Sequence, residues 1–228
     1  MSVPGLRKLH PGYKQPLVNG RTLAIPIERL EGSGVLPDTI DMSTNHSLNN
    51  HFLIAMPALD DPNFHHTTTY ICEHDENGAL GVVINRPLEM QLGEILQHMD
   101  IEACNEEISS RPVYMGGPVQ NDRGFVLHEP AGDWEATLKV TDSIGITSSR
   151  DILQAIAAGK GPENAIITLG YAGWAAGQLE EELAANTWLS GPASSRIVFE
   201  TPSEERWLAA AALLGIDLNL LSGDAGHA

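Results

Sequence analysis

The sequence predicts an α+β fold, and three observations carry that prediction. Between residues 52 and 84, short apolar or β-branched stretches follow one another with only turn signals between them, as in antiparallel hairpins. From residue 143 onward, such stretches alternate with segments whose apolar residues recur at helical spacing. The length of 228 residues, of which 42% are hydrophobic, suits a globular chain with one buried core. Early hairpins and late alternation favour α+β over a doubly wound parallel sheet.

The first half of the chain is predicted to be mostly strands. Three stretches have strand composition, at residues 52–56, 67–73 and 79–84. The turn formed by Glu76, Asn77 and Gly78 joins the last two as a hairpin. Helical spacing of apolar residues predicts a helix over 91–99. Four further short strands are expected, at residues 113–115, 124–128, 136–140 and 143–147.

The second half mixes helices and strands. Ser148 and Asp151 resemble a capping box, so a helix is expected there, ending at Gly159. Thr201 followed by Pro202 predicts the start of another helix, which ends before Gly215. One further helix with a solvated acidic face (Glu180, Glu181, Glu182) is expected over 178–185. Strands are predicted over 165–171, as the central strand, and over 196–199.

The N-terminal segment differs from the rest. Residues 1–41 contain five Pro and five Gly and have nearly balanced charge, which predicts a poorly ordered arm before a single domain over 42–228. Met42 resembles a second start. The arm is therefore a misassigned start, a cloning remnant or a genuine extension, and the sequence does not choose among them. The small, polar tail after Leu221 is expected to fray.

Charge and cysteine content restrict the classes of partner and the compartment. The formal net charge is −17, with 13 Lys and Arg against 30 Asp and Glu. Such a chain repels phosphate backbones and anionic membranes, which argues against direct nucleic-acid binding. No apolar run is long enough to span a bilayer, and the first 30 residues do not resemble a signal peptide. Cys72 and Cys104 are expected to be reduced thiols of a cytoplasmic protein.

No motif of a known catalytic or nucleotide-binding site is present. The chain contains no phosphate-binding loop, no dinucleotide-binding glycine pattern after a strand, no nucleophile elbow and no H-E-x-x-H. The densest set of metal-capable residues is His65, His66, Cys72 and His74, of which Cys72 and His74 would share a face of a regular strand. A metal needs three or four converging ligands, so we expect an ordinary loop and strand end there. We predict no metal, no cofactor and no catalytic residue.

Four strings of the chain resemble those of the AlgH/YqgE family of bacterial proteins. They are G-V-V-I-N-R-P at 81–87, G-G-P-V at 116–119, G-F-V-L-H at 124–128, and G-Y-A-G-W with its continuation over 170–189. The resemblance extends from Phe52 to Leu220 and implies an antiparallel sheet bent into a pseudo-barrel with helices packed outside, in a cytoplasmic protein. It implies no reaction, although the family often carries the label of transcriptional regulator. The absence of a convincing helix-turn-helix and the acidic charge give that label little support.

Six residues of these strings are candidates for one binding cleft, namely Asn85, Arg86, Gly116, Gly117, Trp174 and Gln178. Arg86 is one of only eight Lys or Arg in residues 42–228 and could pair with an acid or hold an anionic ligand or a partner carboxylate. The structural alternatives are a tight turn at the two glycines and a buried Trp174.

Three classes of function are weighed. The favoured one is a regulatory protein that binds a protein partner or a small ligand. The second is an enzyme of unrecognised type using Cys72, His74 or Glu181. The third is a DNA-binding regulator that depends on the five cations of the arm. The identity of the ligand or partner and the oligomeric state stay open.

Overall fold

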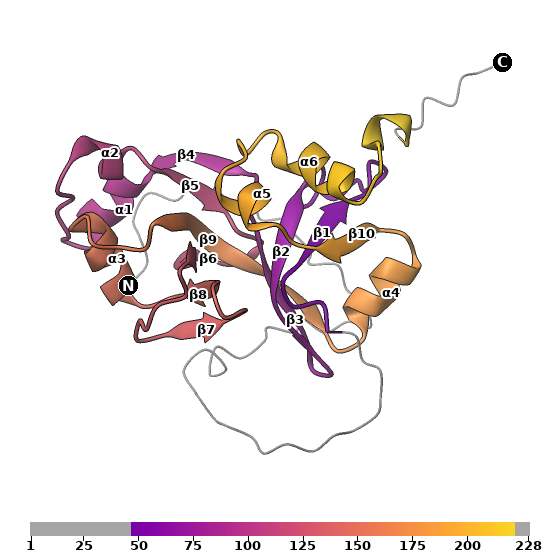
Figure 1. Cartoon of the computed structure of the whole chain (residues 1–228), viewed down its shortest axis with the longest axis horizontal. Coiled ribbons are helices and arrows are strands. Elements are labelled where there is room, and N and C mark those ends of the chain that lie inside the picture. The colour runs from indigo at the N-terminus through magenta and orange to yellow at the C-terminus, as the bar shows by residue number, and fades with distance from the viewer. Residues whose placement is uncertain (1–46, 222–228) are drawn as a thin grey trace.

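Ten strands form one hydrogen-bonded network in the computed structural model, which describes residues 47–221. The strand order is β10-β1-β2-β3-β9-β6-β8-β7, with β5 pairing to β4 and β9. The network is mostly antiparallel and curls into a half-barrel (Figure 1), as predicted; β5 and β9 form a parallel pair within it. The strands are β1 (His51–Ala55), β2 (Thr68–Asp75), β3 (Gly78–Val83), β4 (Pro87–Gln91), β5 (Pro112–Met115), β6 (Val119–Glu129), β7 (Thr137–Lys139), β8 (Gly145–Thr147), β9 (Asn164–Ala175) and β10 (Trp188–Pro192).

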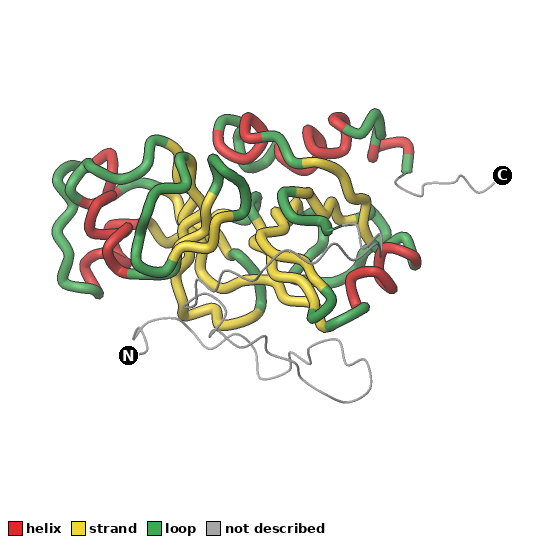
Figure 2. The backbone as a smooth tube through the Cα atoms, turned by 60° about the horizontal axis from the view of Figure 1, so that its bottom comes forward, coloured by secondary structure: helices red, strands yellow, loops and turns green. Residues whose placement is uncertain are grey.

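Helices lie around the sheet and cover its faces. Figure 2 shows them at the periphery of the molecule, with the strands between them. They are α1 (Leu92–His98), α2 (Glu106–Ser109), α3 (Arg150–Ala157), α4 (Gln178–Ala184), α5 (Ser195–Phe199), α6 (Arg206–Leu213) and the short 3-10 helix η2 (Leu218–Leu220). None of the helices in the described part of the chain is long and apolar enough to cross a membrane.

The long strand β9 connects three apolar clusters. Its residues 164–169 pair with β6 on one edge, and residues 167–169 pair with β5 on the other, whereas residues 172–175 pair with β3. Accordingly, Tyr171 packs inside the half-barrel with α5 and α6, Leu169 packs under α1 to α3, and Trp174 packs under α4. The strand changes partners near Gly170. Its φ of 73° lies in the left-handed region, which glycine adopts with little steric strain because it has no Cβ. This central position of β9 was predicted from its apolar run.

Two predictions about the C-terminal third were wrong. Residues 196–199, predicted as a strand, form helix α5, in which the amide of Val198 donates to the carbonyl of Ser194. Burial of Ile197 and Val198 against the half-barrel core outweighs their β propensity. Helix α6 begins at Arg206 and not at Thr201, because residues 202–205 close a separate turn first.

Other segments went unpredicted or lie beyond the described residues. Strands β4 and β10 and helix α2 were not anticipated, and β6 begins five residues earlier than expected. The predicted arm over residues 1–41 and the predicted frayed tail after Leu221 lie outside the described range 47–221.

Candidate functional site

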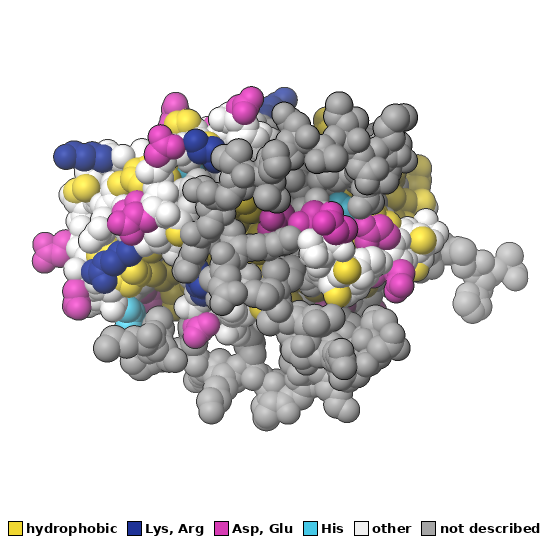
Figure 3. Space-filling view, turned by 90° about the horizontal axis from the view of Figure 1, so that it is seen from below, with side chains coloured by type: hydrophobic (Ala, Val, Ile, Leu, Met, Phe, Trp, Pro, Cys, Tyr) yellow, Lys and Arg dark blue, Asp and Glu magenta, His cyan; other side chains and the backbone are white. Residues whose placement is uncertain are grey.

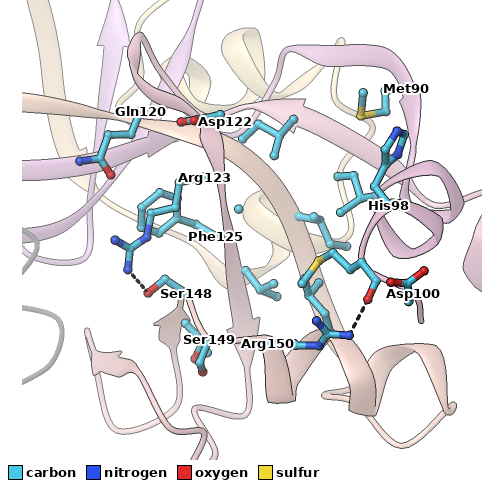
Figure 4. Close-up of a pocket in the computed structure, with 18 residues that line it drawn as sticks. Met90, His98, Asp100, Gln120, Asp122, Arg123, Phe125, Ser148, Ser149 and Arg150 are labelled. Carbon is cyan, nitrogen blue, oxygen red and sulfur yellow. Dashed lines mark hydrogen bonds between the residues drawn. The ribbon is translucent and has the colours of Figure 1, made fainter. Parts of the chain in front are cut away.

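A pocket of about 820 Å³ lies between helices α1 and α3 and the outer face of strands β6 and β9 (Figure 4). Its floor is apolar and consists of side chains of Ile95, Met99, Val126, Leu153, Ile167 and Leu169. Its rim is polar and consists of His98, Asp100, Gln120, Asp122, Arg123, Ser148, Ser149 and Arg150. An apolar floor with a few polar groups at the rim is the usual composition of a small-molecule site.

Gly124 opens the floor of this pocket. Side chains alternate along a strand, so position 124 shares the pocket-facing side of β6 with Val126. On the neighbouring strand β9, the residues opposite these two are Leu169 and Ile167. A Cβ added at Gly124 would meet no heavy atom within 4 Å, so its backbone faces open space. The pocket is therefore deeper at Gly124 than it would be with a larger residue at this position.

An irregularity in β6 places Arg123 at the rim. The pairing of β6 with β9 shifts register between Val119 and Gly124, and Gln120 within this stretch has a φ of 48°. Bulges of this kind re-aim side chains and are frequent beside functional sites. The Arg123 guanidinium stacks over the Phe125 ring, with 5.6 Å from Cζ to the ring centroid, and its Nη2 donates to Ser148 Oγ at 3.0 Å.

Arg150, the first residue of α3, forms the opposite end of the same rim. Its side chain is exposed, and its Nη2 donates to the backbone carbonyl of Met99 at the end of α1. The N-cap residue of α3 is Ser149, not the predicted Ser148, and the carboxylate of Asp151 in the first turn accepts from the amide of Ile152. Burial acts to raise the pKa of this carboxyl, but hydrogen bonds from Ser149 Oγ and the amides of Glu135 and Ile152 lower it overall. Because Asp151 already accepts from these donors, the positive groups left for a ligand at this rim are the guanidinium groups of Arg123 and Arg150.

Asn85 and Arg86, two of the sequence candidates, fasten the loop over residues 61–66. Asn85 Oδ1 accepts from the amide of Thr68, and its Nδ2 donates to the carbonyl of His66. The Arg86 guanidinium donates to the carbonyls of Pro62 and His65. Burial lowers the pKa of Arg86 from its ordinary value. Both side chains therefore hold the loop that connects β1 to β2 through hydrogen bonds to its backbone.

Gly116 and Gly117 lie where β3, β5 and β9 meet. The Gly116 amide donates to the carbonyl of Leu169, and its carbonyl accepts from the amide of Val83. A Cβ at Gly116 would lie 2.3 Å from the Gly170 carbonyl oxygen. A Cβ at Gly117, where φ is 154°, would lie 2.2 Å from the backbone of Tyr171. Both positions therefore require glycine because two backbones come into close contact.

Trp174 and Gln178 belong to a polar network around Glu182. The indole nitrogens of Trp174 and Trp188 both donate to Glu182 Oε2, at 2.9 and 2.8 Å. Gln178 Nε2 donates to Glu182 Oε1 at 2.9 Å. The predicted solvated acidic face of this helix is thus wrong in part, because Glu182 and Glu180 both have side-chain partners across the fold. The network attaches α4 to the sheet.

The metal-capable residues do not converge. The ladder between β2 and β3 shifts register between Ile71 and Glu73, so Cys72 packs inside the half-barrel while His74 turns to Glu180 on α4, at 2.9 Å. The expectation that the two share a face was wrong for this reason. Burial also raises the pKa of the Cys72 thiol. In the described residues, no group of three or more His, Cys, Asp or Glu is placed to hold a metal ion.

The structure thus separates the six sequence candidates from the pocket. Asn85, Arg86 and Gly116 lie near one another, since the Arg86 carbonyl accepts from Met115 beside Gly116, and Trp174 with Gln178 lies under α4. None of the six lines the pocket. The sequence analysis did not select Gly124, Arg123 or Arg150. A glycine inside an otherwise apolar strand was the available signal, because it often marks a close approach of ligand or backbone.

Comparison with known proteins agrees with the fold described above. A family model described as AlgH-like matches residues 52–219. A protein of Nitrosococcus oceani named UPF0301 protein is 59% identical over 187 residues, covering 82% of this chain and 100% of the relative. A similarly named protein of Thioalkalivibrio sulfidiphilus is 55% identical, with the same coverage. These names state no reaction, ligand or partner.

Two solved structures share the architecture. The solution structure of the AlgH protein from Pseudomonas aeruginosa is similar with a TM-score of 0.67 and 49% identity, covering 83% of this chain and 100% of that one. A Corynebacterium diphtheriae protein is similar with a TM-score of 0.60 over 79% of this chain and 94% of its own, and at 19% identity it shows the fold alone. The match of the family model and the high identity of these relatives establish that this chain belongs to the AlgH-like family.

Proposed function

We propose that this protein binds a small ligand in the pocket beside Gly124 and acts in regulation by binding and not by turnover. The observation that carries the proposal is the depth left by Gly124 opposite Leu169, in a floor built from two paired strands and two helices. The volume of about 820 Å³ lies within the roughly 300–1,000 Å³ usual for ligand pockets. Strands hold a site more rigidly than loops do, which favours a preformed pocket.

The rival functions have less support. The groups considered for an enzyme lie apart, with Cys72 inside the half-barrel and His74 bound to Glu180. A DNA-binding protein needs a stripe of exposed basic side chains. Arg86 and Arg206 do not contribute to such a stripe, because their guanidinium groups donate to backbone carbonyls. The two cysteines are unpaired thiols, which supports placement in the reducing cytosol.

A substitution that fills the pocket tests the proposal. Gly124→Phe places a ring over Leu169 without a clash at Cβ, and Gly124→Ala adds a methyl group in open space as the matched control. The readout is fluorescence of N-phenyl-1-naphthylamine, an uncharged apolar dye, titrated with each folded protein. We expect wild type and Gly124→Ala to bind alike and Gly124→Phe to bind at least about ten-fold more weakly, equivalent to roughly 1.4 kcal/mol.

Thermal unfolding of each variant checks that the fold is retained. Equal dye binding by Gly124→Phe and wild type would contradict the proposal, because the dye would then lie elsewhere. Recovery of a bound compound from the purified protein, chemically unchanged after incubation, is expected for a binding role. Its conversion to a product would favour an enzyme.

A further inference from the structure

We infer that the ligand of this pocket is a small amphipathic anion, with its apolar body on the floor and its charged group between Arg123 and Arg150. This inference rests on the proposed function and specifies its ligand class. Three features of the pocket carry it: the placement of its arginines, the groups that flank them, and the composition of its floor.

The placement of the arginines is unusual for so acidic a chain. The chain has 13 Lys and Arg against 30 Asp and Glu, and only eight of the Lys and Arg lie beyond residue 41. Two of those eight line one pocket. Figure 3 shows most of the visible Lys and Arg side chains over the half of the molecule that carries α1 to α3, where they are interspersed with Asp and Glu, whereas the band of acidic side chains over the other half has none among it. The pocket thus lies in the half where the visible cations gather, and these offset part of the repulsion that an anion meets.

The two guanidinium groups lack the partner that such groups usually have. Lys139 forms an ion pair with Asp133 at 3.1 Å, but within residues 47–221 neither Arg123 nor Arg150 pairs with a carboxylate. Arg123 donates to a hydroxyl, Ser148 Oγ, and Arg150 to the carbonyl of Met99. A guanidinium has five N–H donors, so donors of both arginines remain for a ligand carboxylate or phosphate.

The groups along this edge favour an anion between the arginines. Figure 4 shows Ser148 and Ser149 between Arg123 and Arg150 at one edge of the pocket. Ser148 Oγ accepts from Arg123, so its own hydroxyl proton is free to donate to the ligand. Two acids also line the pocket, and both are exposed: Asp100 follows Met99 at the end of α1, and Asp122 precedes Arg123. Figure 4 shows Asp122 at the opposite side of the pocket from the two serines, whereas Asp100 lies at the end that holds Arg150.

The apolar floor requires more of the ligand than a charge. Leu153, Ile167 and Leu169 are buried, and Ile95 and Met99 pack against them from α1. Inorganic phosphate alone would gain nothing from this floor, because it has no apolar atoms to place on it. An alkyl or aryl body would leave water to pack on the floor, which adds roughly 0.8 kcal/mol per buried methylene of the ligand. An anionic head group joined to an apolar body satisfies both parts of the pocket.

The test compares three eight-carbon compounds that differ in head group: octanoate, 1-octanol and octylammonium. Each is titrated by calorimetry into full-length wild type, Arg123→Gln, Arg150→Gln and the control Arg196→Gln. Arg196 is exposed on α5, away from the pocket, and its replacement makes the same change in net charge. Thermal unfolding confirms that all four proteins are folded.

We expect wild type to bind octanoate at least about ten-fold more tightly than 1-octanol, since charge-assisted hydrogen bonds are stronger than neutral ones. Arg123→Gln and Arg150→Gln should each weaken octanoate without changing 1-octanol, and Arg196→Gln should leave both unchanged. Equal binding of octanoate and 1-octanol, tighter octylammonium, or an equal effect of Arg196→Gln overturns the inference. The inference also fails if none of the three compounds binds. In all these cases the proposed function stands as long as Gly124→Phe still weakens dye binding about ten-fold, and it fails too if Gly124→Phe leaves dye binding unchanged.

Discussion

Glu182 is the residue whose replacement should most clearly loosen helix α4. Its carboxylate accepts hydrogen bonds from the indoles of Trp174 and Trp188 and from the Gln178 amide. The two tryptophans are only 3% and 4% exposed, so their N–H groups have little access to water as a substitute. Glu182→Ala therefore removes the shared acceptor of two buried donors at once.

The magnitude follows from those two donors. A buried donor left without an acceptor costs about 1–3 kcal/mol, so two of them give roughly 2–6 kcal/mol. Glu182 is itself partly exposed, and water that enters the vacated volume moves the expected loss to the lower half, about 2–4 kcal/mol. For a chain of this size, that loss lowers Tm by roughly 4–16 °C.

Urea denaturation followed by tryptophan fluorescence measures this loss directly. Glu181→Ala is the matched control, because Glu181 is exposed one position earlier on the same helix. Glu182→Gln is expected to lose less than the alanine variant: it keeps an acceptor for the indoles but turns an amide donor toward Gln178 Nε2. If Glu182→Ala loses no more stability than Glu181→Ala, the network does not hold the helix and the reasoning is refuted.

Two further predictions concern the sheet. Gly116→Ala should destabilise the fold by about 3 kcal/mol or more, because its Cβ would lie 2.3 Å from the Gly170 carbonyl oxygen and neither backbone can withdraw; urea denaturation measures it. Burial lowers the pKa of His128 despite its hydrogen bond to the Pro130 carbonyl, so below pH about 6.5 the unfolded chain binds more protons than the folded one. The free energy of unfolding should therefore fall as the pH drops from 7 to 5, and this slope should be smaller in His128→Gln.

Each of these predictions has an outcome that contradicts it. Gly124→Ala is the control for Gly116→Ala, since its methyl group meets no atom within 4 Å, and equal stability of the two variants would contradict the close-contact argument. For His128, parallel curves of unfolding free energy against pH in wild type and His128→Gln would show that burial of this imidazole does not drive the acid sensitivity.

Local patterns predicted most elements correctly because their causes are local. The Asn77-Gly78 turn sets the β2–β3 hairpin, and the apolar spacing of α1 and the stop at Gly159 are properties of short segments. Where packing outweighed local preference, the predictions failed. Ile197 and Val198 have β propensity, yet they form a helical turn whose two side chains are buried in the half-barrel core.

The candidate site was harder to predict than the fold. The sequence candidates stand out because few other residue types could replace them. The structure gives a reason within the fold for four of them: hydrogen bonds of the side chains of Asn85, Arg86 and Trp174, and a close backbone contact at Gly116. A residue type can be required by a close contact within the fold as readily as by a ligand. Sequence alone cannot separate these two requirements, since the partner atoms lie far away along the chain.

The amino-acid sequence by itself determined the acidic charge, the α+β class, the order of most elements and the membership of a family through four glycine-containing strings. Only the tertiary structure decided where a ligand fits. The pocket depends on the pairing of Gly124 with Leu169 and on the register shift that aims Arg123, and α1 and α3 close it from two other parts of the chain. Pairing and register between distant segments are set by how whole faces pack, and no local pattern encodes that choice.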